Sequence, residues 1–151
     1  MRARSDNAAD APYRRIRAIS VSLANLRHAV LESRFMGIFQ VPAHLTGPTG
    51  RSQEVELLMD TGATFLVVPK SLADRLELRP SRTCDIQTAG GREESWPLAE
   101  VHLRLDGDEV TTRCLIAPEG PALLGAVALE SLLLAVDPIA KRLVPVKGFV
   151  G

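Results

Sequence analysis

Apolar and polar residues alternate along much of the chain beyond residue 36, and this alternation predicts a mostly β protein. In the clearest case, Val101, Leu103 and Leu105 fall on one face of a strand. His102 and Arg104 fall on the other face. Further stretches are predicted to be extended because they alternate or are short apolar runs between turns: residues 37–45, 55–59, 65–68, 84–88, 95–98, 110–116, 134–136 and 142–146.

Turn-forming residues separate these stretches. Residues 46–50 and residues 106–108 are rich in glycine, proline or aspartate and predict tight turns. Ala89, Gly90 and Gly91 stand between two short strands, and a Gly-Gly turn in that place predicts a hairpin. On these residues alone, a plain surface hairpin is an equally good interpretation.

Two short helices are predicted within the β region. Pro69 lies near the start of the first helix, over residues 72–76, with Ser71 as its N-terminal cap. The second helix covers residues 126–133. Asp137 is followed by proline, so we interpret it as the opening residue of a turn and not as a chemical group.

The first 35 residues form a separate region of the sequence. Residues 1–12 lack periodicity and are predicted to be disordered. Residues 13–35 have the spacing of an amphipathic helix, whose apolar face consists of Ile16, Ile19, Leu23, Leu26 and Val30. Three interpretations stay open: a helix that packs on the domain or on a partner, a basic targeting segment, and sequence upstream of a functional start at Met36. The chain is therefore divided into an N-terminal extension, residues 1–35, and one domain, residues 36–151.

Charges are divided unequally between these two parts. Residues 1–35 hold seven arginines against three acidic residues, and the remainder holds 11 basic and 15 acidic residues. Because the domain is net acidic, no nucleic-acid partner is expected. No stretch reaches the roughly 20 apolar residues that span a membrane, and no secretory pattern opens the chain. We expect a cytoplasmic protein without a membrane partner.

Cysteines and histidines give no sign of a metal site. Cys84 and Cys114 lack the spacing of metal ligands, and His28, His44 and His102 lie far apart in the sequence. The two cysteines are interpreted as reduced core residues, with a disulfide as the alternative.

Asp60 is the candidate for chemistry. Acidic side chains are rarely buried without compensation, so an aspartate between apolar runs is either a turn residue or a chemical one. It occupies the segment Leu57-Leu58-Met59-Asp60-Thr61-Gly62-Ala63-Thr64-Phe65-Leu66-Val67-Val68-Pro69. A second motif, Leu123-Leu124-Gly125-Ala126, directly precedes the second predicted helix.

Together, these segments resemble the active-site loop and the hydrophobic-hydrophobic-glycine segment of the retropepsin-like (clan AA) single-domain aspartic proteases. Their order and separation fit that family as well, and the resemblance covers residues 37–146. It implies a closed β-barrel with a flap hairpin and one or two short helices. The predicted N-terminal amphipathic helix would be an addition to this fold.

The resemblance implies an aspartic endopeptidase that hydrolyses peptide bonds with an activated water, without a cofactor or a metal. Because the chain holds a single Asp-Thr-Gly, two copies must each supply Asp60, which makes the expected enzyme a homodimer. Thr61 would bond across the two-fold axis, and Gly62 would leave room for the loop to turn. Ala63 and Thr64 complete the loop. Since Ala63 cannot donate a hydrogen bond to Asp60, activity is expected at milder pH than in pepsin-like enzymes.

The same resemblance assigns the other site residues. Ala89, Gly90 and Gly91 would form a flap over bound peptide, and the substrate pocket would include Leu124, Gly125 and Ala126. The expected partners are a second copy of the chain and a peptide or protein substrate. The alternative function is a catalytically weak module that keeps the fold and dimerises or binds peptides.

Overall fold

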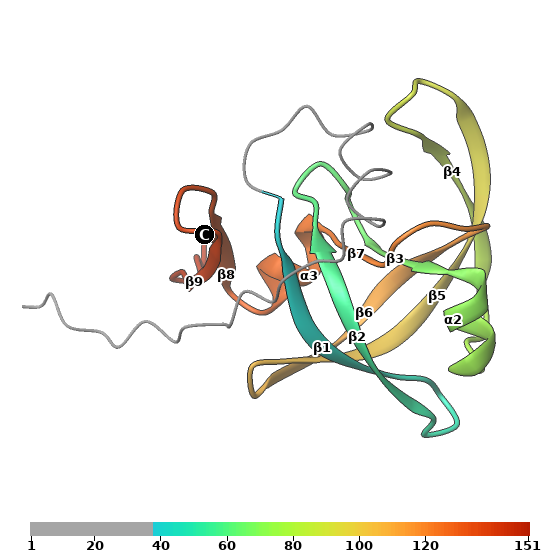
Figure 1. The fold of residues 1–151 in the computed structure, drawn as a ribbon, viewed down its shortest axis with the longest axis horizontal. Coiled ribbons are helices and arrows are strands. Elements are labelled where there is room, and N and C mark those ends of the chain that lie inside the picture. The colour runs from blue at the N-terminus through green and yellow to red at the C-terminus, as the bar shows by residue number, and fades with distance from the viewer. Residues whose placement is uncertain (1–37) are drawn as a thin grey trace, which may run out of the picture.

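The structure, a computed structural model, describes residues 38–151, which form mainly β-strands (Figure 1). The strands are β1 (Gln40–Thr46), β2 (Ser52–Met59), β3 (Leu66–Pro69), β4 (Arg82–Gln87), β5 (Glu93–Leu105), β6 (Asp108–Ala117), β7 (Leu123–Leu124), β8 (Leu134–Asp137) and β9 (Arg142–Pro145). The helices of this region are α2 (Lys70–Arg75) and α3 (Ala126–Ser131). The predicted mostly β class is confirmed, although the strands expected at 95–98 and 101–105 are one continuous strand, β5.

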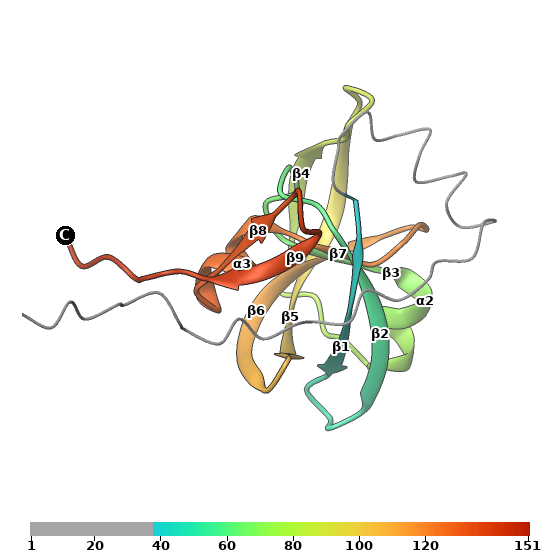
Figure 2. The ribbon, with the colours of Figure 1, turned by 60° about the vertical axis from the view of Figure 1, so that its left-hand side comes forward.

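A strand from late in the sequence, β7, lies between β2 and β3. In the described residues, seven strands form one sheet in the order β1-β2-β7-β3-β6-β5-β4. β7 runs parallel to β2, with Leu124 opposite Met59, and antiparallel to β3, with Leu123 opposite Val67. β1 also pairs with β5, so the sheet curls back toward its first strand (Figure 2). The loop between β2 and β3, which carries Asp60, is therefore positioned by a distant segment of the chain.

Alternation along the strands separates the buried side chains into two clusters. The main core joins β1, β2, β3, β5, β6 and both helices, and includes the fully buried Leu45, Leu66 and Leu103. A second cluster lies on the opposite face of β3 and β6, because successive strand residues point to opposite faces. We call it the flap-side cluster; it consists of Val67, Leu98, Leu115 and Ala117, with Phe65, Cys84, Ile86, Trp96 and Leu123 packed against them.

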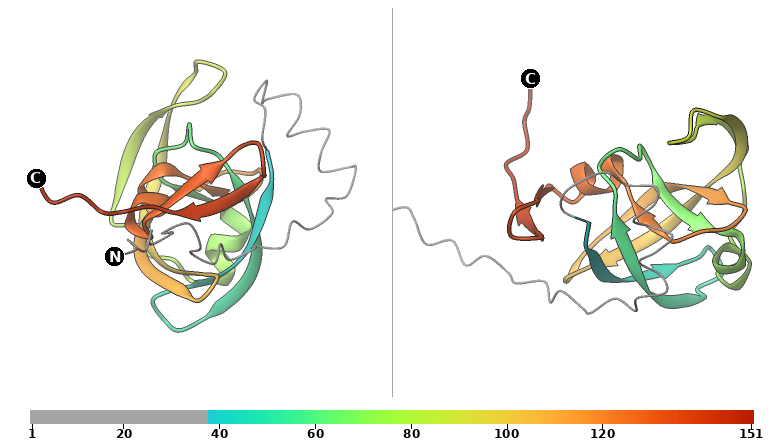
Figure 3. Two further views of the ribbon diagram at one scale, coloured as in Figure 1. Left: turned by 90° about the vertical axis from the view of Figure 1, so that its left-hand side faces the viewer. Right: turned by 45° about the horizontal axis from the view of Figure 1, so that its top comes forward.

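The predicted Gly-Gly hairpin is confirmed, and it stands away from the rest of the sheet (Figure 3). At its turn, the Thr88 amide donates to the Arg92 carbonyl and the Gly91 amide donates to the Thr88 carbonyl. Gly91 has a φ of +79°, which glycine adopts without strain. We call residues 84–96 of this hairpin the flap hairpin.

Two details of the helix predictions are wrong. Ser71 does not cap α2, whose N-cap is Pro69 without a side-chain cap bond. Pro69 ends β3, and its fixed φ leads straight into the helix at Lys70, which leaves Ser71 inside the first turn. The second helix, α3, ends at Ser131 because Leu133 takes a left-handed φ of +52°.

The C-terminal strands β8 and β9 form a separate two-stranded sheet beyond α3 (Figure 1). Asp137 opens the turn between them, as predicted. Its carboxylate accepts hydrogen bonds from the amides of Ile139 and Ala140 and lies 3.3 Å from Nε of Arg142. The Ala140 amide, together with the Arg142 guanidinium, holds the pKa of Asp137 below its ordinary value. These contacts account for Asp137 as a structural residue.

Two further expectations from the sequence concern the N-terminal helix and helices that span a membrane. The N-terminal helix predicted for residues 13–35 lies outside the described residues. Among residues 38–151, neither helix has the length and apolar character that crossing a membrane requires.

Candidate active site

The backbone of Asp60 is held by two hydrogen bonds. Its amide donates to the carbonyl oxygen of Leu124 in β7, with a nitrogen-to-oxygen distance of 3.1 Å. Its carbonyl oxygen accepts from the amide of Ala63, also at 3.1 Å. The first bond ties the residue to the neighbouring strand, and the second closes the turn of the Asp60 loop, residues 60–65. These backbone hydrogen bonds fix the position of Asp60 independently of its side chain.

The carboxylate of Asp60 is oriented by the backbone of the same loop. Its Oδ1 atom accepts a hydrogen bond from the Gly62 amide at 3.0 Å. A Cβ atom at position 62 would lie 3.2 Å from that oxygen, so glycine leaves room for the approach. Asp60 is half-buried, whereas Thr61 and Gly62 are exposed at the tip of the turn. The loop thus presents one oriented carboxylate beside an exposed surface.

Helix α3 begins against the Asp60 loop. Its N-cap is Gly125, which supplies no side-chain cap. Instead, the amides of Ala126 and Val127 donate to the carbonyl oxygens of Ala63 and Thr64, at 2.8 and 3.0 Å. Because the first amides of a helix have no partner within the helix, the loop satisfies them and is held by them in return. The two segments singled out in the sequence are therefore in direct contact.

Gly125 makes this contact sterically feasible. A Cβ atom there would lie 2.3 Å from the carbonyl oxygen of Phe65 and 2.7 Å from that of Ala63. Both distances are shorter than a carbon and an oxygen tolerate without a bond, and both neighbours are backbone atoms. Gly125, the glycine of the second motif, therefore allows the backbone at the start of α3 to lie directly against the backbone of the Asp60 loop.

The two leucines of β7 face opposite sides of the sheet. Leu124, predicted to line a substrate pocket, is fully buried in the main core, where it cannot reach a bound peptide. Leu123 is only partly buried and packs in the flap-side cluster. The local sequence did not distinguish two adjacent leucines, because only the pairing partners of β7 decide which of its faces turns toward the core.

The flap hairpin is connected to the Asp60 loop through the flap-side cluster. Its tip residues Ala89, Gly90 and Gly91 are exposed. Its inner residues Cys84, Ile86 and Trp96 pack against this cluster, as do Phe65, at the end of the loop, and Leu123. Phe65 and Leu123 both lie within the two sequence motifs, but the sequence alone assigned neither of them a role in the site. The alternation of strand faces could have identified Phe65 and Leu123. Their neighbours Leu66 and Leu124 both belong to the main core, so Phe65 and Leu123 lie on the opposite face.

Cys84 and Trp96 form a cross-strand pair at the base of the flap hairpin. Trp96 packs in the flap-side cluster. Cys84 and Cys114 are both free, so the disulfide alternative is wrong. Burial raises the pKa of the Cys114 thiol to about 12, which keeps it protonated in the core.

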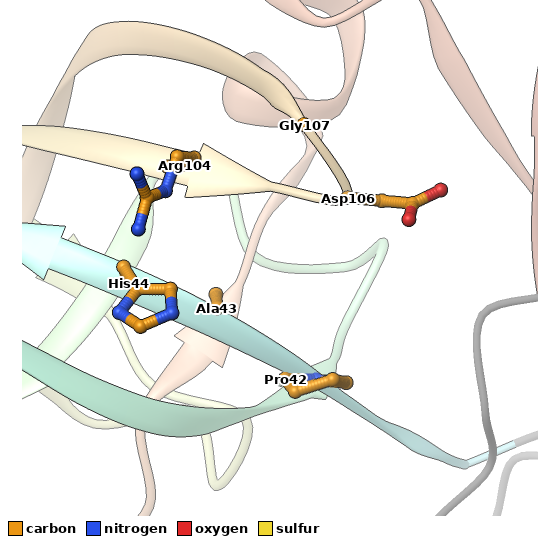
Figure 4. Close-up of a pocket in the computed structure, with 6 residues that line it drawn as sticks. All are labelled: Pro42, Ala43, His44, Arg104, Asp106 and Gly107. Carbon is orange, nitrogen blue, oxygen red and sulfur yellow. The ribbon is translucent and has the colours of Figure 1, made fainter.

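A cavity of about 390 Å³ lies elsewhere and is lined by Pro42, Ala43, His44, Arg104, Asp106 and Gly107 (Figure 4). It lies between β1 and the turn that joins β5 to β6. On β1, Gln40 pairs with Leu58 near the Asp60 loop, whereas His44 pairs with Glu54, farther from that loop. The cavity is therefore not part of the candidate active site. Across residues 38–151, no three His, Cys, Asp or Glu side chains come together as ligands of a metal ion would.

A family model described as aspartyl protease matches residues 41–128. The matched span is more than half of the chain and includes both the Asp60 loop and Gly125. The chain therefore belongs to the aspartyl protease family, and its predicted retropepsin-like character is confirmed.

Solved structures of retroviral proteases are similar to this chain. EIAV protease complexed with the inhibitor HBY-793 has a TM-score of 0.52 and 21% sequence identity, over 66% of this chain and 92% of that chain. Simian foamy virus (mac) protease has a TM-score of 0.44 and 23% identity, over 60% of this chain and 93% of that chain. The first similarity supports the fold, and its sequence identity is too low to transfer a function. No curated protein matches the chain in sequence.

Proposed function

We propose that the protein is an aspartic endopeptidase whose active site forms between two copies of the chain. The observation that carries this proposal is Asp60, a half-buried carboxylate oriented by the Gly62 amide in an exposed turn. Membership of the aspartyl protease family supports peptide-bond hydrolysis as the reaction. The sequence holds one Asp-Thr-Gly, so a second copy must supply the second carboxylate. In this proposal, the curled sheet is the closed barrel of the family.

The proposed mechanism needs only the two Asp60 carboxylates and a water molecule. Two carboxylates a few ångströms apart cannot both ionise easily, so the pair shares one proton. The ionised carboxylate takes a proton from water, which attacks the scissile carbonyl carbon, while the protonated one donates to the carbonyl oxygen. The resulting tetrahedral diol then collapses, the carbon–nitrogen bond breaks, and the amine leaves with a proton. The Gly62 amide keeps Oδ1 oriented throughout.

The surroundings of Asp60 support roles for the other residues. Thr61 is exposed at the turn, where its hydroxyl can meet the same residue of a second copy. The flap hairpin would cover a peptide bound beside the Asp60 loop, with Gly90 at its exposed tip. Leu123, in place of the predicted Leu124, would contribute apolar surface to a side-chain pocket, because it is the β7 leucine on the flap side.

The first test is the Asp60→Asn variant of the full-length protein, incubated with a mixed peptide library and followed by mass spectrometry. Asparagine keeps the size and hydrogen-bonding capacity of aspartate but cannot exchange a proton in this way, so cleavage should stop. Asp108→Asn makes the same chemical change at the exposed first residue of β6 and should cleave like the parent. Specific products from Asp60→Asn at a rate near that of the parent would contradict the proposal. A parent that binds library peptides without cleaving them would favour the peptide-binding module instead.

The second test separates a shared site from a site within one chain. Specific activity should fall on dilution and recover on concentration, because only the dimer holds a complete pair of carboxylates. Thr61→Ala should shift the midpoint of this curve by roughly tenfold toward higher concentration, the effect of two lost hydrogen bonds of about 0.5–1.5 kcal/mol each. Initial rates and analytical ultracentrifugation over the same concentrations measure both. Full specific activity in monomeric samples would exclude the shared site.

A further inference from the structure

One face of the flap hairpin carries both apolar and charged side chains. Across this hairpin, Cys84 pairs with Trp96, and Ile86 pairs with Glu94. Cys84, Ile86 and Trp96 all pack in the flap-side cluster, so this is the inner face of the hairpin. Because side chains two residues apart on a strand share a face, Glu94 also belongs to the inner face. Glu93, the preceding residue, belongs to the outer face and is exposed.

The carboxylate of Glu94 is held in place by the only tryptophan of the chain. Its Oε2 atom accepts a hydrogen bond from Trp96 Nε1 at 2.9 Å. Its Oε1 atom lies 3.7 Å from Nη2 of Arg92. The Glu94 side chain is 31% exposed, whereas the Arg92 side chain is 81% exposed. An ion pair with such an exposed partner contributes little and is readily exchanged for another cation.

The charge around Glu94 favours a positively charged ligand. Residues 84–96 contain three acidic residues and one basic residue, which gives the flap hairpin a net charge of −2. The proposed pair of Asp60 carboxylates adds further negative charge on the side that the flap hairpin faces. A cation that approaches from this side would therefore meet a favourable field before it contacts Glu94.

We propose that Glu94 is a specificity-determining residue, which selects peptides with a lysine or arginine side chain under the flap hairpin. This inference rests on the proposed function, because it assumes that the peptide lies between the flap hairpin and the Asp60 loop. The substrate cation takes the place of Arg92 at Oε1, while Trp96 keeps Oε2 oriented. The apolar residues of the flap-side cluster hold the other substrate side chains. The substrate class is thus a peptide that is apolar near the scissile bond and has one basic residue nearby.

The experiment compares matched peptides that contain lysine, its uncharged analogue norleucine, or glutamate at each position around one cleaved bond. For the parent protein, kcat/KM for the lysine peptide should exceed that for the norleucine peptide at one position. The expected ratio is roughly ten- to a hundredfold, the range of one charge-assisted hydrogen bond. Glu94→Gln keeps an acceptor for Trp96 but removes the charge, so this ratio should approach one, mainly through KM. Glu93→Gln makes the same charge change on the outer face and should keep the parental ratio.

A binding measurement keeps this inference separate from the proposed catalysis. Isothermal titration calorimetry with the Asp60→Asn protein, with and without Glu94→Gln, gives the Kd of each peptide without cleavage. Selective binding of the lysine peptide, lost in Glu94→Gln, would support Glu94 as the determinant even if no peptide is cleaved. Cleavage with the same lysine-to-norleucine ratio in the parent and in Glu94→Gln would overturn the inference and leave the protease proposal standing. If the peptides are neither cleaved nor bound selectively, both proposals fail.

Discussion

The Asp60 loop and the flap hairpin face the same side of the domain but are built in opposite ways. The Asp60 loop receives hydrogen bonds from α3, donates one to β7, and lies against the backbone of Gly125. The flap hairpin has strand pairing, one tight turn and a cluster of apolar side chains at its base. The loop is therefore held by one distant segment, residues 124–127, whereas the hairpin is held mainly by its own strand pairing. We therefore expect the loop, which orients the carboxylate, to be more rigid than the hairpin.

The sharpest test of this difference is the same substitution in each region. Gly125→Ala should destabilise the protein by at least about 3 kcal/mol, because the added Cβ overlaps two backbone oxygens that cannot rotate away. Gly90→Ala should change stability by less than about 0.5 kcal/mol, since the nearest atom, Thr88 Oγ1, is 3.9 Å from the added Cβ. Urea unfolding followed by circular dichroism measures both. Equal losses would show that the two regions are packed alike.

Amide hydrogen exchange tests the rigidity itself. The Ala126 amide bonded to Ala63 and the Thr88 amide bonded to Arg92 have the same nitrogen-to-oxygen distance, 2.8 Å. Bond length alone therefore predicts similar protection. We expect the Ala126 amide to exchange at least about a hundredfold more slowly, because opening it requires α3 to separate from the Asp60 loop. Comparable exchange rates would mean that the flap hairpin is as rigid as the loop.

Substitutions at a third glycine, Gly91, distinguish a steric requirement for glycine from a conformational one. Gly91 has open space around it but a φ of +79°, so its requirement is conformational and not steric. Gly91→Ala should cost about 1–2 kcal/mol, the penalty of a left-handed conformation for a residue with a Cβ. Gly91→Asn should recover part of this loss, because asparagine tolerates that conformation better. No rescue by asparagine would contradict the conformational explanation.

Acid should weaken the contact between the end of α2 and the turn that joins β1 to β2, which lies at the far end of β2 from the Asp60 loop. Glu77, just beyond α2, accepts hydrogen bonds from Thr49 and Arg51 in the turn between β1 and β2. The Thr49 hydroxyl, and after it Arg51, holds the pKa of Glu77 below its ordinary value. Its stabilising effect is therefore complete above the ordinary glutamate pKa of about 4.3 and is lost as the pH falls through the lower folded-state pKa.

Urea midpoints at pH 6 and pH 3 test this small effect. On acidification, the urea midpoint of Glu77→Gln should fall less than that of the parent. It should still fall in part, because the pKa of Asp137 is also lowered and its stabilising effect is also lost in acid. Glu93→Gln, on the outer face of the flap hairpin, should fall as the parent does. If the urea midpoints of Glu77→Gln and the parent fall equally, Glu77 does not contribute to the loss of stability in acid.

Much of the local structure could be predicted from the sequence, because it depends on neighbours along the chain. Val101, Leu103 and Leu105 are buried on one face as their alternation requires. The Gly-Gly hairpin and the Asp137 turn also follow from residues within a few positions. Ser71 shows the limit of this approach: it has the chemistry of a cap, but Pro69 sets the backbone that starts α2.

Only the tertiary structure decided how the two motifs become one site. Asp60 and Gly125 were both identified in the sequence, but the insertion of β7 between β2 and β3 brings them together. That pairing also turns Leu123 toward the flap hairpin and Leu124 into the core. A one-residue shift in register would exchange these two leucines, and a run of similar apolar residues does not specify such a register locally. The sequence by itself therefore determined the two motifs, and packing between distant strands determined which of their residues face the candidate site.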